Sequence, residues 1–195
     1  MLMGAFGRKG CGKTSLMVQS CLYLAGRGRL IFAYDPMHQF PDANRFDFEG
    51  FEDVETVPSL VAFSDCEPDD VAQLALSTGD CIFACDEADL LCSPNVWYSE
   101  AARNIARRGR HYRVGMILTG LRFANVHRDI AALADVLALF HTEDEEDVRR
   151  IERRVGRVYA DHVTGLSQGE FLAHPFRQLA RLGLDGAEAQ ARPLP

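Results

Sequence analysis

The stretch that decides the fold is GRKGCGKTS, Gly7 to Ser15, close to the start of the 195-residue chain. It fits the pattern G-x-x-x-x-G-K-[ST], a loop whose backbone N–H groups surround nucleotide phosphates. The glycines permit the tight turn, Lys13 offers a charge to the outer phosphates, and Thr14 offers a hydroxyl to Mg²⁺. We expect ATP to contact the whole stretch, namely Gly7, Arg8, Lys9, Gly10, Cys11, Gly12, Lys13, Thr14 and Ser15.

The residues on either side have the context that this loop requires. Met1–Phe6 is a short apolar run of strand length, and residues 13–28 place apolar side chains at helical spacing before the glycines Gly26 and Gly28. A helix that begins at the loop adds the anion affinity of its N-terminus. The alternative, a glycine-rich turn followed by a chance Lys-Thr, does not explain this strand–loop–helix order.

A second motif, CIFACDEAD, spans Cys81–Asp89 and ends an apolar run with Asp86 and Glu87. In a parallel sheet such a pair lies at the carboxyl edge, beside the phosphate-binding loop. We expect Asp86 to hold Mg²⁺ together with Thr14, and Glu87 to act as the general base for an attacking water. Small-molecule kinases that share a P-loop need no such base, because their nucleophile is the substrate. The pair therefore favours ATP hydrolysis over the alternative, a strand that ends in surface acids.

Composition narrows the class of protein. The 47% of hydrophobic residues suffices for a core, and no apolar run reaches the length of a bilayer. The six cysteines form no C-x-x-C pair, which favours reduced core thiols in a cytosolic protein over a zinc site. We expect a soluble chain that is not secreted and has no membrane span of its own.

Apolar runs of strand length alternate with helical patterns along the chain. Further strands are expected at 29–36, 59–65, 81–85, 112–120, 135–141 and 169–174. Further helices are expected at 68–79, 95–109, 127–134 and 143–156, with a loop and a short extended piece in 37–58. This order predicts an α/β fold of three layers, a mainly parallel central sheet flanked by helices, in the RecA/ASCE-type arrangement of P-loop NTPases. We expect a motor domain at 1–183 and a flexible tail at 184–195.

The segment Ala106–Phe140 resembles the FtsK–HerA superfamily of DNA-pumping ATPases. The matching positions are Gly109, Arg110, His111, Gly115, Thr119, Arg122, Val126, Ala134, Asp135 and Phe140, and LSQGEF at Leu166–Phe171 resembles the closing strand of the family. Larger members carry an N-terminal barrel or membrane domain, whereas this chain starts on its first core strand. The size and layout are most similar to the DNA-packaging ATPases of tailless, internal-membrane viruses and their proviruses.

This resemblance implies further site residues. Many members carry Gln as a γ-phosphate sensor at the end of the fourth core strand, whereas here Gly120 follows Thr119. Sensing would then belong to Thr119 or Arg122. In ring ATPases of this kind, each subunit donates an arginine finger to the nucleotide site of its neighbour. Loss of this arginine lowers the hydrolysis rate by a factor of about 10³ or more. Arg108 and Arg110 are the candidates, because we expect them at the mouth of a core strand, next to the functional edge.

The resemblance also implies a function and partners. It indicates a Mg²⁺-dependent ATPase that translocates double-stranded DNA in a hexameric ring, in the host cytoplasm or on the virion, with a capsid vertex or viral membrane protein as a further partner. The arginines of 102–115 would contact phosphates without regard to sequence, although the chain carries a net charge of −7. Two alternatives are a phage assembly module similar to the zonular occludens toxin, and a plasmid or conjugative DNA-transfer ATPase.

Overall fold

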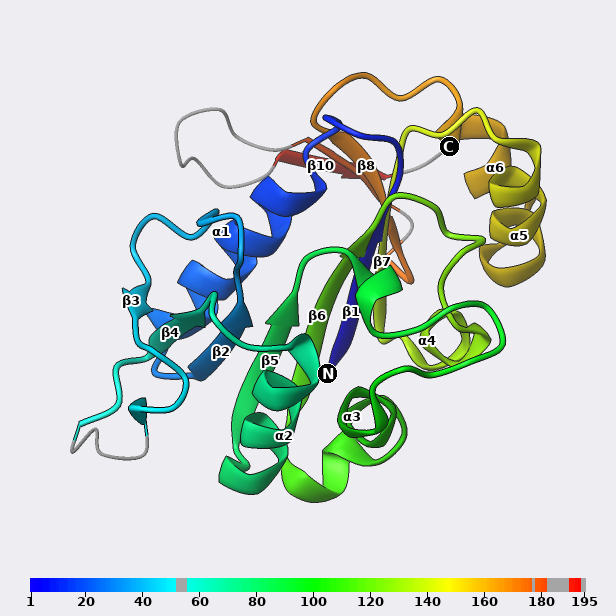
Figure 1. Ribbon diagram of the computed structural model, residues 1–195. Coiled ribbons are helices and arrows are strands. Elements are labelled where there is room, and N and C mark those ends of the chain that lie inside the picture. Colours follow the sequence, from blue (N-terminus) through cyan, green and yellow to red (C-terminus); the bar gives the residue numbers. More distant parts are fainter. Residues whose placement is uncertain (52–55, 177, 182–189, 194–195) are drawn as a thin grey trace.

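The structure of the protein is a computed structural model, which describes residues 1–51, 56–176, 178–181 and 190–193. Within these residues, a 10-stranded sheet runs through the protein (Figure 1). The strands are β1 Leu2–Phe6, β2 Leu30–Tyr34, β3 Asn44–Arg45, β4 Leu60–Phe63, β5 Cys81–Cys85, β6 Gly115–Gly120, β7 Val136–Phe140, β8 Glu170–His174, β9 Gln178–Arg181 and β10 Gln190–Pro193. Their order across the sheet is β10-β9-β8-β7-β1-β6-β5-β2-β4-β3. Across the sheet, each neighbouring pair from β7 through β1, β6, β5, β2 and β4 to β3 is parallel. On the other side of β7, the strands β8, β9 and β10 follow in antiparallel pairs.

This order confirms the mainly parallel sheet that the sequence predicts. It also places β6 between β1, which leads into the P-loop, and β5, which leads into Asp86 and Glu87. Because β1, β5, β6 and β7 run in one direction, their carboxyl ends meet at one edge of the sheet. That edge, here called the carboxyl edge, collects the residues of both motifs.

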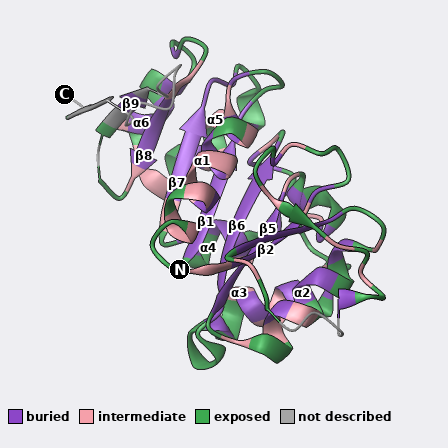
Figure 2. Ribbon diagram, turned by 90° about the vertical axis from the view of Figure 1, so that its left-hand side faces the viewer, coloured by how far each residue is buried: buried purple, intermediate pink, exposed green. Residues whose placement is uncertain are grey.

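Helices cover both faces of the sheet, as the three-layer prediction requires. They are α1 Lys13–Ala25, α2 Pro68–Thr78, α3 Glu100–Tyr112, α4 Arg128–Leu133, α5 Glu145–Val155 and α6 Arg157–Val163, with a short 3-10 helix, η2, at Ala88–Leu90. Helix α1 packs on one face, and residues of α2 to α6 share the core of the other face. Figure 2 shows the buried strands lying between these helices.

The hydrophobic core consists of two clusters, one on each face of the sheet, and the central strands contribute side chains to both. In β6, Met116 and Leu118 face the cluster under α2, α3 and α4, whereas Ile117 faces the cluster under α1. Successive side chains of a strand point to opposite faces. Since both faces of this sheet are covered, its central strands read as continuous apolar runs and not as alternating patterns. The described helices include none that is long and apolar enough to cross a membrane.

Helix α3 differs from the expected helix at 95–109. It begins after Ser99, whose hydroxyl accepts a hydrogen bond from the N–H of Ala102, and it continues to Tyr112. Gly109 does not end the helix. A Cβ at this position would lie 2.4 Å from the carbonyl oxygen of Val114, so the glycine permits close packing of α3 against the turn that follows.

The C-terminal part of the chain also differs from expectation. Helix α6 follows α5 after Gly156, where only one helix was predicted. Within the tail that we expected to be flexible, Gln190–Pro193 form β10, which pairs with β9. The rest of 184–195 lies outside the described residues. The short extended piece expected within 37–58 is β3.

Candidate active site

The P-loop connects β1 to α1 at the carboxyl edge. Gly7 has a φ of 151°, and a Cβ there would lie 2.6 Å from the Cβ of Phe140, so no other residue fits without displacement. Gly12, with a φ of 110°, caps the N-terminus of α1 in the left-handed region. The loop therefore has the tight turn that its glycines predict, and its last residues begin a helix whose N–H groups attract anions.

Lys13 is buried inside this loop. Its ammonium donates a hydrogen bond of 2.9 Å to the carbonyl oxygen of Arg8, on the opposite side of the turn. A phosphate would offer the ammonium a stronger, charge-assisted partner. Cys11 is buried beside Lys13, and burial raises the pKa of the Cys11 thiol above its ordinary value of 9.0, so the thiol is neutral. Arg8, Lys9, Gly10 and Ser15 are exposed.

The two motifs meet where the sequence predicts. The hydroxyl of Thr14 donates a hydrogen bond of 3.0 Å to Oδ2 of Asp86. A hydroxyl and a carboxylate are hard oxygen ligands, which Mg²⁺ prefers, and Mg²⁺ takes its remaining ligands from waters and substrate phosphates. Thr14 and Asp86 thus fit the metal that the P-loop implies. The described residues contain no group of three or more His, Cys, Asp or Glu side chains that could hold a metal ion by themselves.

Glu87 follows Asp86 in an unusual backbone conformation. Its φ of 61° and ψ of 75° lie in the left-handed region, which is uncommon for residues other than glycine. Its side chain is exposed, whereas Asp86 is half-buried against Thr14. Such conformations are held in place by the surrounding structure and cluster at functional sites. The two neighbouring carboxylates therefore have separate environments, one at the metal position and one open to a water.

Thr119 lies at the end of β6 and contacts both acidic residues. Its hydroxyl donates a hydrogen bond to Oδ1 of Asp86 and accepts one of 3.3 Å from the N–H of Glu87. A hydroxyl has one proton to donate, and Thr119 directs that proton to Asp86. Thr119 therefore fixes Asp86 and the backbone of Glu87 relative to β6. Whether it also senses the γ-phosphate stays a prediction.

Arg122 lies in the loop after β6, close to the tip of the P-loop. It forms ion pairs with Asp144 and, at 3.7 Å, with Asp147, both at the start of α5. Together with Arg8 and Lys9 it lines a hollow of about 400 Å³. This position beside the P-loop is compatible with the sensor role that the family resemblance implies. No local sequence pattern predicts the two α5 partners, which belong to a separate element.

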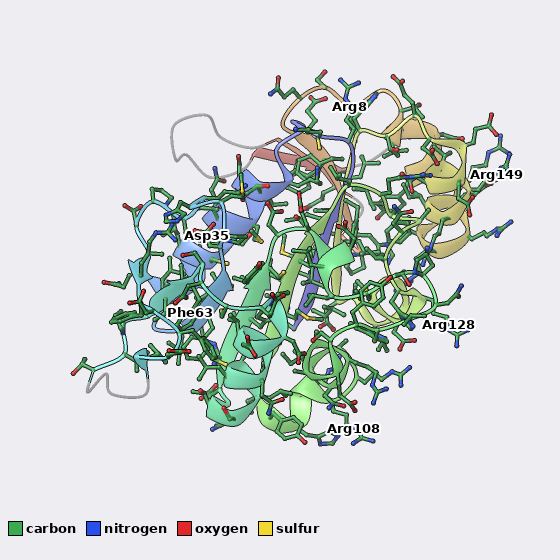
Figure 3. All side chains as sticks on the ribbon, viewed as in Figure 1. Arg8, Asp35, Phe63, Arg108, Arg128 and Arg149 are labelled. Atoms are coloured by element: carbon green, nitrogen blue, oxygen red, sulfur yellow. The ribbon has the colours of Figure 1, made fainter. Side chains whose placement is uncertain are left out.

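Arg108 and Arg110 do not lie where we expected them. They belong to the C-terminal end of α3, and Arg110 pairs at 3.0 Å with Asp135, directly before β7. This is the amino edge of the sheet, and Figure 3 shows Arg108 and the P-loop residue Arg8 at opposite ends of the molecule. Residues that precede a parallel strand lie at the edge opposite those that follow it. Neither arginine can reach the P-loop of its own subunit, so a role in trans stays a prediction.

One further segment belongs to the site although no sequence motif predicts it there, the loop between α6 and β8. The N–H of Gly169 donates a hydrogen bond of 3.0 Å to the carbonyl oxygen of Cys11, and the side-chain amide of Gln168 donates one of 3.2 Å to the carbonyl oxygen of Gly10. The LSQGEF motif was interpreted only as the start of a strand. Its contact with the P-loop depends on β8 lying antiparallel beside β7, which no local pattern indicates.

Comparison with solved structures supports this arrangement. The genome packaging NTPase B204 from Sulfolobus turreted icosahedral virus 2, solved in complex with AMP, is similar with a TM-score of 0.74 and 16% identity over 98% of this chain and 96% of that chain. VirB4 of Thermoanaerobacter pseudethanolicus gives a TM-score of 0.63 and 11% identity over 99% and 88% of the two chains. The N-terminal domain of the Neisseria meningitidis zonular occludens toxin gives 0.51 and 12% over 100% and 94%. No protein-family model and no curated protein matches the chain.

The chain has the fold of a P-loop NTPase. The similar structures include a genome packaging NTPase, the class that the resemblance of Ala106–Phe140 names, so that resemblance is confirmed at the level of the fold. B204 was also solved in complex with AMPPCP and with ATP-gammaS.

Proposed function

We propose that the protein is a Mg²⁺-dependent ATPase that translocates double-stranded DNA, as a hexameric ring, during viral genome packaging. The observation that carries the hydrolytic part is the contact between Thr14 and Asp86, with Glu87 open to solvent beside it. The DNA-related part is supported by the resemblance of Ala106–Phe140 and by the similarity to a genome packaging NTPase.

Each residue of the site has a role in this chemistry. Lys13 and the N–H groups of the loop bind the phosphates, while Thr14 and Asp86 hold Mg²⁺, which would neutralise charge that develops on the phosphate oxygens. The carboxylate of Glu87 accepts a proton from a water that attacks the γ-phosphorus, and the bond from that phosphorus to the β–γ bridging oxygen breaks, so that ADP and phosphate leave. Thr119 keeps the two acidic residues in place. We assign γ-phosphate sensing to Arg122, which already lies beside the P-loop.

The proposed partners follow from this function. Duplex DNA would be bound through its phosphates, and five further copies of the chain would complete the ring. A capsid vertex or viral membrane protein would anchor the motor, which would act in the host cytoplasm or on the virion. Within the ring, Arg108 or Arg110 would act as an arginine finger at the nucleotide site of a neighbouring subunit.

The test is ATP turnover measured with and without linear duplex DNA. We expect turnover that depends on Mg²⁺ and rises with duplex. Glu87→Gln should lower kcat by a factor of about 10²–10⁴, because it removes the general base, while ATP binding remains. Glu146→Gln, which neutralises an exposed acid on α5, should leave both unchanged. Turnover that is absent, or that Glu87→Gln does not affect, would contradict the proposal.

The similarity to the zonular occludens toxin favours one of the two alternatives, a nucleotide-switched assembly module. The same measurement separates the two functions. Turnover that duplex DNA does not stimulate, combined with co-purification of a membrane partner, would support the assembly role. Stimulation by linear duplex supports the packaging role.

A further inference from the structure

The C-terminal half of α3 carries a concentration of positive charge that the nucleotide site does not use. Helix α3 and the residue after it contain five arginines and a single acid, Glu100, in the first turn. We call these arginines the α3 arginine surface: Arg103, Arg107, Arg108, Arg110 and Arg113. The chain as a whole has a net charge of −7, so this surface is a local excess. A helix dipole favours cations only in the last turn, and Arg103 and Arg107 lie before it.

These guanidinium groups are accessible. The side chain of Arg110 is 86% exposed and that of Arg113 is 75% exposed. Arg110 pairs with Asp135 at 3.0 Å, and Arg113 lies 3.7 Å from Asp80. Exposed ion pairs of this kind contribute little to stability. A phosphate can therefore replace the carboxylate partner at small cost.

The spacing of the arginines suits a phosphate backbone. Arg103, Arg107 and Arg110 follow one another at i, i+4 and i+7, so they lie along one side of the helix. With a rise of 1.5 Å per residue, they span about 10 Å. One strand of a duplex places a phosphate about every 3.4 Å along its axis. The row thus covers about three phosphates.

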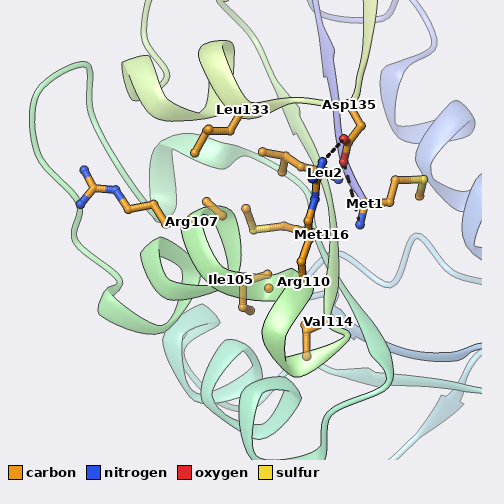
Figure 4. A pocket seen from close by; sticks show the side chains of 11 residues that line it. Met1, Leu2, Ile105, Arg107, Arg110, Val114, Met116, Leu133 and Asp135 are labelled. Carbon is orange, nitrogen blue, oxygen red and sulfur yellow. Dashed lines mark hydrogen bonds and ion pairs between the residues drawn. The ribbon is translucent and has the colours of Figure 1, made fainter.

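Two hollows lie on either side of Arg110. One, of about 230 Å³, is lined by Arg107 and Arg110 together with Leu133 and Asp135. The other, of about 330 Å³, is lined by Arg29, Arg110 and Arg113. Figure 4 shows Arg110 directed from α3 toward Asp135, while Arg107 points away from that pair. Cations on both sides of a concave surface provide places where phosphate oxygens can be bound.

We infer that duplex DNA binds through its phosphates to the α3 arginine surface, at the amino edge of the sheet and opposite the nucleotide site. This inference rests on the proposed function. Arginine contacts phosphate with two hydrogen bonds at once, and phosphate contacts carry no sequence information. Strand β6 joins the two sites directly: Arg113 precedes its start by two residues, and Thr119 near its end contacts Asp86 and Glu87.

The experiment compares Arg103→Ala/Arg107→Ala/Arg113→Ala with a matched control, and it leaves Arg108 and Arg110 unchanged because they are the candidate arginine fingers. The control, Arg149→Ala/Arg153→Ala/Arg157→Ala, removes three exposed arginines from α5 and α6. Binding of a fluorescent 30-base-pair duplex is measured by anisotropy from 50 to 300 mM salt, and ATP turnover is measured without DNA. Since each phosphate contact contributes about 0.9 to the slope of log K against log salt, the α3 triple variant should lose about 2–3 from that slope. The control should lose nothing, and DNA-independent turnover should persist in both.

A second variant tests the charge itself. Arg103→Lys/Arg107→Lys/Arg113→Lys keeps three cations at the same positions, so most of the wild-type slope should remain. An unchanged slope in the alanine variant, when the wild type binds duplex, would overturn the inference and leave the proposed function intact. A wild type that binds no duplex at 50 mM salt would overturn both. Loss of DNA-independent turnover in folded α3 alanine protein would also overturn the inference, because it would assign Arg103, Arg107 or Arg113 to ATP hydrolysis and not to DNA binding.

Discussion

Thr14, the second residue of α1, donates a hydrogen bond of 3.0 Å to Asp86, which is 72 residues away in the sequence and directly follows β5. The strand between them in space, β6, supplies Thr119, which donates to the other carboxylate oxygen of Asp86. Asp86 is therefore held from two sides by hydroxyl groups that belong to different elements. The geometry of this one carboxylate determines where a metal and a nucleotide can sit.

The first prediction concerns metal dependence. Asp86→Asn removes the charged oxygen that would hold Mg²⁺ and keeps the shape of the side chain. We expect the Mg²⁺ concentration for half-maximal ATP turnover to rise at least tenfold. Asp89→Asn, at an exposed position of η2, is the control with the same change of charge and should leave the Mg²⁺ requirement unaltered. An equal Mg²⁺ requirement in the wild type and in Asp86→Asn would exclude Asp86 from the metal site.

The second prediction concerns Thr119 as a positioning residue. Thr119→Val keeps the shape but removes the hydroxyl that contacts Asp86 and Glu87. We expect kcat to fall by about 10- to 100-fold, since a misplaced general base loses part of its contribution of about 10²–10⁴. The Kd for ATP, measured with a fluorescent analogue, should change less than threefold.

Thr119→Ser is the matched control for that experiment. It restores the hydroxyl and should recover most of kcat. A Thr119→Val protein that turns over ATP at the wild-type rate, or one that loses ATP binding together with kcat, would contradict the positioning role.

The third prediction concerns stability at acidic pH. His127 is buried next to Trp97, with ring centroids 5.0 Å apart, and faces Asp129, Arg128, Arg107 and Arg150. Burial lowers the pKa of His127 below its ordinary value of 6.5, the nearby arginines lower it further, and Asp129 opposes them. The unfolded chain then binds more protons than the folded protein as pH falls below about 6.5. Stability from this group is thus present above that pH and is lost below it.

We therefore expect the urea midpoint of the wild type to fall more steeply from pH 7.5 to pH 5 than that of His127→Gln. The comparison uses the slope, because the substitution itself costs stability at every pH. His111→Gln, at an exposed position, should retain the wild-type slope. Parallel curves for the wild type and His127→Gln would show that His127 does not titrate in this range.

The nucleotide site, formed by the P-loop together with Asp86 and Glu87, could be predicted from the sequence because two physical rules place its residues. The P-loop requires a strand before it and a helix after it, and the sequence predicts both, from the apolar run Met1–Phe6 and from the helical spacing over 13–28. Parallel strands place their carboxyl ends at one edge, so Asp86 had to lie near Thr14.

The same edge rule, applied to Arg108 and Arg110, would have placed them at the amino edge, because they precede β6. The sequence pattern instead predicts a helix that ends at Gly109 and a strand that starts at Tyr112. The close contact of Gly109 with Val114 explains the glycine in another way, by the packing of α3. A glycine at a close approach and a glycine at a helix end look alike in a sequence.

The contacts of the P-loop with Gly169 and Gln168, and those of Arg122 with Asp144 and Asp147, could not be predicted. They join elements that are far apart in the chain and depend on the order of β8, β7 and β1 in the sheet. Helix α6 and strands β9 and β10 are short, and their stability comes from packing more than from a strong local pattern.

The central claim is that ATP hydrolysis moves the protein along duplex DNA. It is tested most directly by whether the protein displaces a third DNA strand that is bound to a duplex. A fluorescent oligonucleotide is bound as a triplex near one end of a linear duplex, and its release is followed after addition of protein, Mg²⁺ and ATP. The account predicts release by the wild type that requires ATP hydrolysis, no release by Glu87→Gln, and normal release by Glu146→Gln. Release that proceeds equally with the Glu87→Gln protein, or no release by a wild type that hydrolyses ATP on the same duplex, would contradict it.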